Sequence, residues 1–229
     1  MPAPRDDDAL LLQWQQGDDA AGTLLFERHF DAIARFFRNK TDGPLDDLVQ
    51  RTFLGCLEGR DRIRGDAGFR GYLFGVARNV LRTSWQARAP DRSLDEIDDA
   101  SIVEMGASPA SAYARDRTQL AMLNALRRIP LEAQLVLELC YWEQMSARGV
   151  AAVLHVPLGT AKTRIRRART LLTRELAAVA AGSTPLHSTA TRLDTWARVV
   201  RAQAQDTHPP ERNPTPNAIR SGSHRTSSS

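Results

Sequence analysis

Apolar residues recur three or four positions apart through most of residues 8–86, which is the spacing of amphipathic helices. The pattern begins at Leu10, Leu11 and Trp14, and no alternating pattern typical of strands interrupts it. Gly- and Asp-containing turns separate the segments at residues 17–19, 41–44 and 64–68. Ten of the fourteen aromatic residues lie between Trp14 and Trp85. The sequence therefore predicts a helical domain with an aromatic-rich core over residues 8–88.

The rest of the chain divides into three parts. Residues 89–113 lose the periodicity and mix Pro, Gly, Ser and acidic residues, which indicates a flexible linker. Residues 114–181 contain closely spaced amphipathic segments and predict a second compact helical domain. Residues 182–229 are rich in Ser, Thr, Pro and Arg and predict a largely disordered tail, with a short helix over 190–205. The predicted fold class is all-α, with two small domains.

The strongest local pattern lies between Ser146 and Arg174. Val150, Val153 and Leu154 give one short helix an apolar face, and His155 and Val156 form a tight turn. Pro157 suits the first turn of a second helix, whose apolar positions face back. This spacing predicts a helix-turn-helix.

The charge on the second helix of this motif indicates what it binds. Six cations and no acidic residue occur between positions 162 and 174. Such a concentration of like charge is stabilised by a polyanion, and phosphate contacts release counterions from DNA. The second helix is therefore predicted to bind DNA, with its N-terminal side chains near base edges in the major groove.

The formal net charge of +4 conceals two unlike halves. Residues 1–110 hold 14 basic and 19 acidic side chains, whereas residues 111–229 hold 17 basic and 8 acidic ones. Residues 60–92 are an exception in the acidic half, with 8 basic and 3 acidic side chains interleaved with aromatics. Cations that follow a backbone beside aromatic faces are typical of single-stranded DNA binding, although at least half of these aromatics are expected to be core.

Several classes of protein are disfavoured. Cys56 and Cys140 have no disulfide-framework or zinc spacing, and the five His residues belong to no nucleophile, metal or phosphate-loop motif. We expect no enzyme activity, no metal and no cofactor. The N-terminus lacks the features of a signal peptide, and no apolar run approaches the roughly 20 residues that span a bilayer. A cytoplasmic protein without membrane insertion is expected.

Three motifs, in this order, resemble the extracytoplasmic-function (ECF) group of sigma-70-type RNA polymerase sigma factors. They are DDLVQRTFLGCLE, FRGYLFGVARNVLR and PLGTAKTRIRRAR. The resemblance covers about residues 8–180 and implies two helical domains that bind core polymerase and promoter DNA. The first domain would recognise and melt the −10 element, and the second would read the −35 element.

The resemblance also assigns residues. Those that would dock on the clamp helices of the polymerase β′ subunit are Asp46, Asp47, Gln50, Thr52 and Phe53. Those that would contact the −10 element, including a loop that captures a flipped base, are Arg62, Arg64, Phe69, Tyr72, Arg78, Asn79 and Arg82. Those on the −35 recognition helix are Thr160, Lys162, Thr163, Arg164, Arg166, Arg167 and Arg169. The β flap of polymerase and an anti-sigma factor are further partners implied by the family.

The sequence departs from the family pattern at the helix-turn-helix. His155 stands where a Gly is usual, at a position that we expect to need positive φ, and Ala161 replaces a larger apolar residue.

One alternative function stays open from the residues alone. A transcriptional regulator that binds duplex operators would share the helix-turn-helix but would not need the pattern at residues 46–85. The tail beyond Gly182 is a candidate for regulation in cis.

Overall fold

The computed structural model describes residues 6–38, 40–63, 68–106 and 117–180, and these residues form helices and connecting turns. Residues 64–67 and the predicted helix at 190–205 lie outside them. The α-helices in the first half of the chain are α1 (Asp7–Gln15), α2 (Asp19–Arg38), α3 (Leu45–Glu58), α4 (Gly68–Arg88) and α5 (Leu94–Asp99). Those in the second half are α6 (Arg117–Arg128), α7 (Leu131–Tyr141), α8 (Ala147–Leu154) and α9 (Leu158–Ala180). The all-α prediction is confirmed.

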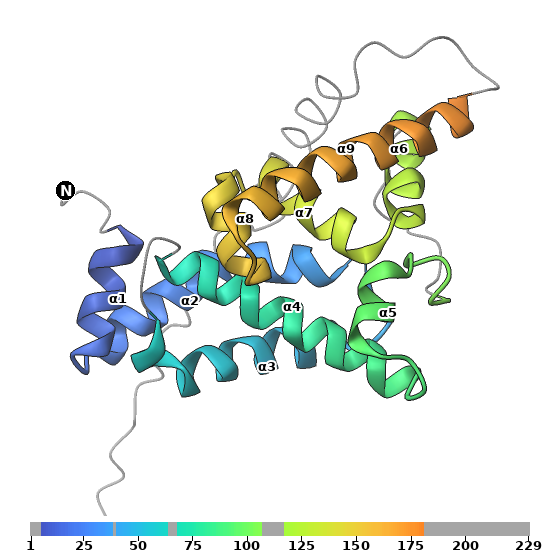
Figure 1. Cartoon of the computed structure of the whole chain (residues 1–229). Helices are drawn as coiled ribbons and strands as arrows, with labels where there is room; N and C mark the ends of the chain where they lie inside the picture. Colours follow the sequence, from blue (N-terminus) through green and yellow to red (C-terminus); the bar gives the residue numbers. More distant parts are fainter. Residues whose placement is uncertain (1–5, 39, 64–67, 107–116, 181–229) are drawn as a thin grey trace, which may run out of the picture.

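Helices α1 to α4 pack together (Figure 1), and aromatic side chains fill the core between them. The Trp14 ring of α1 meets Phe26 of α2 and Phe69 of α4 edge-on, with centroids 5.3 and 6.2 Å apart. Trp14 fits because Gly22 faces it: a Cβ at Gly22 would stand 2.5 Å from the indole nitrogen. The largest aromatic side chains thus hold the first helices together, as the sequence predicted.

Helix α3 differs from the prediction in which residues it buries. Its sequence predicts an apolar face made of Leu48, Phe53, Leu54 and Leu57, yet the exposed fractions of Leu54 and Leu57 are 47% and 49%. The face that packs instead contains Leu48, Val49, Thr52 and Cys56, which follow the three- and four-residue spacing of a helix. Leu57 lies about a third of a turn, and Leu54 about half a turn, from the centre of this stripe, so both fall outside it.

The segment predicted as a linker contains the short helix α5. Ser93 caps it: the Ser93 hydroxyl accepts from the Glu96 backbone N–H at 3.2 Å, and the Glu96 carboxylate accepts from the Ser93 N–H at 2.6 Å. This capping box offsets the cost of ordering a short helix. Ile97 is fully buried, so α5 is anchored on the folded protein.

Helices α6 to α9 form the second unit. Helix α9 packs along α6, α7 and α8, and Val150, Val153, Ala168 and Leu172 meet in its core. These four helices lie within the segment 114–181, whose apolar spacing predicts helices.

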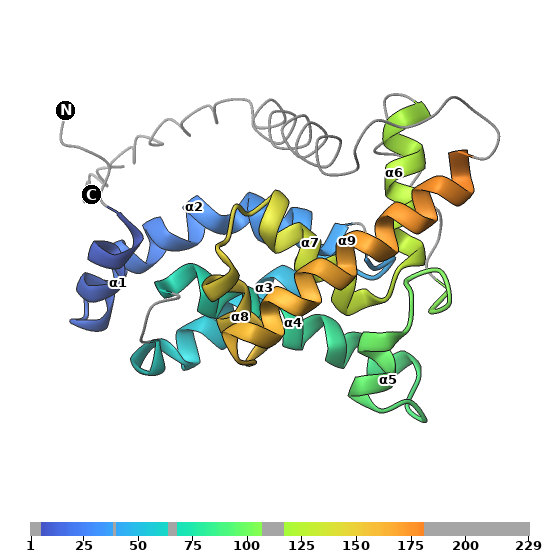
Figure 2. The same ribbon diagram turned by 45° about the horizontal axis from the view of Figure 1, so that its top comes forward.

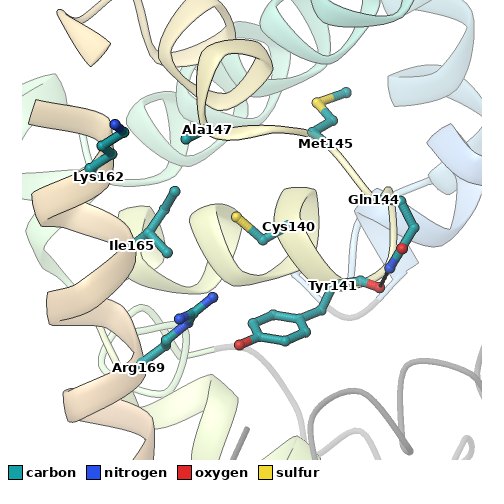
Figure 3. A pocket seen from close by; sticks show the side chains of 8 residues that line it. All are labelled: Cys140, Tyr141, Gln144, Met145, Ala147, Lys162, Ile165 and Arg169. Atoms are coloured by element: carbon teal, nitrogen blue, oxygen red, sulfur yellow. Dashed lines mark hydrogen bonds between the residues drawn. The ribbon is translucent and has the colours of Figure 1, made fainter. Parts of the chain in front are cut away.

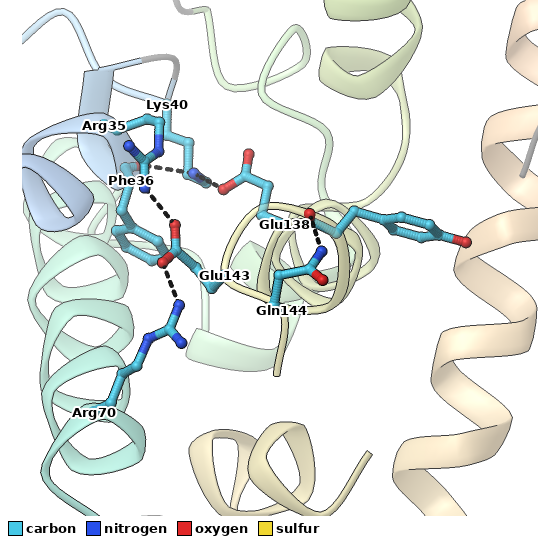
Figure 4. Close-up of polar contacts among 8 residues, drawn as sticks. Arg35, Phe36, Lys40, Arg70, Glu138, Glu143 and Gln144 are labelled. Atoms are coloured by element: carbon cyan, nitrogen blue, oxygen red, sulfur yellow. Dashed lines mark hydrogen bonds and ion pairs between the residues drawn. The ribbon is translucent and has the colours of Figure 1, made fainter. Parts of the chain in front are cut away.

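The two units pack against each other, with α8 beside α4 and α7 beside α5 (Figures 1 and 2). Glu143, which follows α7, accepts a hydrogen bond from Arg35 of α2 at 2.8 Å and another from Arg70 of α4 at 2.7 Å (Figure 4). Lys40, fully buried after α2, forms an ion pair with Glu138 of α7. Cations of the first unit therefore meet carboxylates of the second.

Candidate nucleic-acid and polymerase interfaces

The helix-turn-helix prediction is confirmed at α8 and α9. The Ser146 hydroxyl caps α8 by accepting from the Gly149 N–H at 3.2 Å. His155 ends α8 in the left-handed conformation, with φ 55° and ψ 45°. The Val156 N–H donates to the Ala151 carbonyl at 3.0 Å, which closes the turn before Pro157 starts the next helix. The expected positive φ is thus present, adopted by a histidine.

Helix α9 presents the predicted cations on its outer side. Lys162, Arg166, Arg167 and Arg169 are exposed, as is Thr163, while Thr160 is half-buried. The inner side holds Ala161, Ile165 and Ala168, which are buried. Helix α9 therefore separates its cationic surface from its buried apolar face.

Two of these arginines also interact within the second unit. Arg164 forms an ion pair with Glu132 at the start of α7. The Arg169 guanidinium lies 5.5 Å from the centre of the Tyr141 ring. Both side chains are therefore oriented by their neighbours as well as by the helix.

A pocket of about 530 Å³ opens between α7, α8 and α9 (Figure 3). Cys140, Met145 and Ile165 contribute apolar walls, and Lys162 and Arg169 lie on the α9 side. Burial raises the pKa of the Cys140 thiol. The pocket can therefore accept an apolar group beside the cationic surface.

Helix α4 places the predicted −10 residues in different environments. Asn79 is exposed, Tyr72 is half-buried, and Phe69 is fully buried against Trp14. Phe69 belongs to the core, as expected for at least half of these aromatics. Arg62, in the short 3₁₀ turn Arg60–Arg62, is exposed. Arg64 lies outside the described residues.

Arg78 and Arg82 face the linker helix rather than solvent. Arg78 Nη2 donates to Asp98 Oδ2 at 2.6 Å, and Arg82 Nε lies 3.2 Å from Asp98 Oδ1. Their side-chain exposed fractions are 9% and 14%. Burial lowers the pKa of Arg78, an effect that the nearby Asp98 opposes. Both guanidiniums are thus already paired within the protein.

The predicted polymerase-binding residues lie on α3. Asp46, Asp47 and Gln50 are exposed, whereas Thr52 is fully buried and donates to the Leu48 carbonyl at 2.8 Å. Phe53 is half-buried. Helix α3 therefore brings three of these side chains to the surface and turns Thr52 inward.

An exposed apolar strip beside these residues was missed by the sequence analysis. Phe30 of α2 is 47% exposed, and its ring lies nearly parallel to that of Phe53, 6.3 Å away. Leu54 and Leu57 lie further along α3. Only the helix register, which packing against α2 and α4 fixes, distinguishes this strip from a core face.

Across the parts of the chain that the structure describes, no group of three or more His, Cys, Asp or Glu side chains could hold a metal ion. No helix among them combines the length and the apolar composition needed to cross a membrane. The free thiol of Cys56 is buried, which raises its pKa to about 12.

Comparison with known proteins agrees with this geometry. Residues 25–90 match the family described as sigma-70 region 2, and residues 119–172 match sigma-70 region 4, which together make up more than half of the chain. The second match contains the helix-turn-helix, and the first contains α3 and α4. The match to region 2 does not favour the alternative of an operator-binding regulator.

Individual relatives are similar over most of their length. The ECF RNA polymerase sigma-E factors of Escherichia coli K12 and Salmonella typhimurium LT2 are each 26% identical over 172 residues, which cover 71% of this chain and 90% of the relative. The sigma-E factor of Haemophilus influenzae is 25% identical over 175 residues, covering 72% and 93%. The solved structure of CnrH in complex with the cytosolic domain of CnrY superposes with a TM-score of 0.56 and 26% identity, covering 76% of this chain and 99% of that one. The chain therefore belongs to the sigma-70-type RNA polymerase sigma factors, in the ECF group, which act with RNA polymerase on promoter DNA.

Proposed function

We propose that this sigma factor divides promoter recognition among three surfaces: α3 docks on core polymerase, α4 binds the melted −10 strand, and α9 reads the −35 element. The observation that carries this proposal is the exposed cationic side of α9 in a complete helix-turn-helix, on a chain that also has a region 2 unit. All three surfaces act through binding energy. The resemblance supports each assignment, together with the exposure of Asp46, Asp47 and Gln50 on α3, of Asn79 on α4, and of Lys162, Arg166 and Arg167 on α9.

The polymerase surface is proposed to consist of Asp46, Asp47 and Gln50 together with the apolar strip at Phe30, Leu54 and Leu57. Charged and polar groups around an exposed apolar centre are typical of a protein interface. The finer assignment is that the β′ clamp helices bind here, with Thr52 and Phe53 fixing the shape of α3. Asp47→Arg should reduce co-purification with core polymerase about tenfold, whereas Asp91→Arg, the same charge change at an exposed position between α4 and α5, should not. Equal retention of both variants would contradict this interface.

The −10 surface is proposed to be centred on Asn79. Flipping a base out of the stack costs a few kcal/mol, which contacts available only to the unpaired strand must offset. An exposed amide offers both a donor and an acceptor to a base edge. Asn79→Ala should slow open-complex formation while leaving binding to duplex DNA unchanged. Thr83→Ala, exposed one turn away on α4, is the matched control. Normal opening by the Asn79 variant would remove this assignment.

The −35 surface is proposed to use Thr160, Lys162, Thr163 and Arg164 near base edges, and Arg166, Arg167 and Arg169 on phosphates. Each phosphate contact contributes about −0.9 to the slope of log K against log salt. Replacing both Arg166 and Arg167 by Ala should therefore reduce the magnitude of that slope by about 2. A slope unchanged by this double substitution would place the phosphate contacts elsewhere.

Two protein partners are proposed: the polymerase β flap for the second unit, and an anti-sigma factor for the whole chain. The pocket beside Met145 and Ile165 supports docking of the polymerase β flap, which the family implies. Met145→Lys should then weaken activity at −35-dependent promoters without changing binding to free DNA. The similarity to CnrH, solved with a domain of CnrY, supports an anti-sigma factor as a regulator. Such a protein should co-purify with the chain in the absence of polymerase.

The decisive experiment is run-off transcription with purified core polymerase on a genomic promoter pool, in a buffer at cytoplasmic salt concentration. Transcripts that appear only when the chain is added, and that start downstream of a shared pair of DNA elements, would support the proposal. Absence of any chain-dependent transcript, with tight binding of the free chain to duplex operators, would support the operator-binding alternative.

A further inference from the structure

The acidic helix α5 covers two of the cations proposed to bind the melted strand. Asp98 is 7% exposed and lies between Arg78 and Arg82, at 2.6 and 3.2 Å. Asp95, on the same helix, lies 3.8 Å from Arg82 and is almost fully exposed. Two carboxylates one turn apart thus stand beside two guanidiniums one turn apart on α4.

Helix α5 is held by both units of the protein. Its Ile97 side chain is fully buried, and Asp98 reaches α4. Directly after the helix, the Ala100 carbonyl accepts from the Leu131 N–H of α7 at 2.9 Å, and Ser101 pairs with Pro130. A shift of α5 away from α4 therefore also disturbs the contact between the two units.

The pairing at Asp98 is incomplete. Arg78 Nε, Arg82 Nε and Asp98 Oδ1 are buried and have no hydrogen-bond partner within the protein, although Arg82 Nε and Asp98 Oδ1 are close. Burial raises the pKa of Asp98 against the opposing effect of the two arginines. One carboxylate cannot satisfy every donor of two guanidiniums, whereas a chain of phosphates offers more acceptors. The cluster is therefore suited to exchange its carboxylate for a phosphodiester backbone.

We propose that α5, through Asp98, is an intramolecular competitor of the melted promoter strand for Arg78 and Arg82. In this arrangement the strand binds α4 only after α5 leaves, so strand capture and separation of the two units are coupled events. The inference rests on the proposed role of α4 in binding the −10 strand. It adds that Asp98 and helix α5 cover the strand-binding face of α4 in the free protein.

The test measures binding of the full-length chain to a fluorescein-labelled single-stranded oligonucleotide, taken from the non-template strand of a promoter identified by run-off transcription. Asp98→Asn should tighten binding about tenfold, because a charged hydrogen bond that competes with the strand is lost. Asp99→Asn removes the same charge from the adjacent, exposed position and should change binding less than twofold. Equal affinities of the Asp98 and Asp99 variants would overturn the proposal.

A second variant tests the same displacement of α5 without changing any charge. Ile97→Ala weakens the packing that anchors α5, and it should also tighten strand binding. Asn79→Ala separates the two hypotheses. If it weakens strand binding while Asp98→Asn and Ile97→Ala behave like the unmodified chain, the strand-binding role of α4 stands and the competitor role of α5 fails. If Asn79→Ala has no effect, the proposed role of α4 itself fails.

Discussion

Arg70 and Glu143, 73 residues apart in sequence, meet at 2.7 Å across the boundary between the two helical units. The same carboxylate accepts from Arg35, so one side chain after α7 is bonded to both α2 and α4 (Figure 4). Only 5% of Glu143 is exposed, so breaking these contacts costs more than breaking a surface ion pair.

Glu143→Gln should therefore lower the free energy of unfolding by about 1–2 kcal/mol, because a buried charge-assisted pair is replaced by a weaker neutral one. Glu58→Gln, at an exposed position of α3, should change it by less than about 0.5 kcal/mol. Urea titration monitored by circular dichroism measures both. Equal midpoints would mean that the contact contributes nothing to stability.

Asp7 should make the docking of α1 sensitive to acid. The hydrogen bond from His29 and the nearby Arg28 lower the pKa of Asp7 from 3.8 to about 2. A carboxyl with a depressed pKa stabilises the folded state above its unfolded pKa, and this contribution is lost as pH falls from about 4 towards 2. Solvent screening of this partly exposed carboxyl reduces the contribution of the shift to about 1 kcal/mol. Asp7→Asn should remove this stability at pH 7 and flatten the acid limb, whereas Asp8→Asn should retain that limb. Thermal unfolding between pH 2 and 7 distinguishes them.

Gly22 and Gly159 should respond oppositely to the same substitution. At Gly22 a methyl group would overlap the Trp14 ring, so Gly22→Ala should cost about 1–3 kcal/mol through repacking. At Gly159 no atom lies within 4 Å of the new methyl group, so Gly159→Ala should stabilise α9 by about 0.5–1 kcal/mol. Denaturant unfolding of the two variants measures the difference. A stabilising Gly22→Ala would show that Trp14 can move freely.

His155 provides a test of backbone strain. Its φ of 55° is costly for a residue with a Cβ and costlier for a β-branched one. His155→Gly should stabilise the protein by up to about 1 kcal/mol, and His155→Val should destabilise it by about 1–2 kcal/mol. Melting temperatures of the two variants should bracket that of the unmodified chain. The reverse order would indicate that the histidine ring, rather than the backbone, determines stability at this turn.

The helix-turn-helix could be predicted from sequence because its signals are local: a serine cap, a turn that ends in the left-handed region, and a proline at the next helix. The polar contacts between the units could not, because Lys40 and Glu138 are 98 residues apart and each had other possible partners nearby in sequence. Helix α5 lies between these cases. The Ser93 and Glu96 spacing is a capping signal, but six residues are too few for periodicity to predict a helix.

Leu54 and Leu57 illustrate a further limit. Apolar residues on an amphipathic helix are expected to be buried, but a helix that binds a partner also carries apolar residues that stay exposed until the partner binds. The register of α3 was set by its packing against α2 and α4, which no local pattern specifies.

The placement of α5 on α4 determines what fraction of the free molecules can bind the strand. If only an open state, in which α5 has left α4, binds the strand, the apparent dissociation constant equals the intrinsic one divided by the open fraction. A closed state favoured by about 1.4 kcal/mol would weaken apparent binding roughly tenfold. A partner that favours the open chain would restore the lost affinity by the same factor. The contact between Asp98 and two arginines would thereby set a concentration threshold, below which the free factor leaves single-stranded DNA elsewhere in the cell untouched.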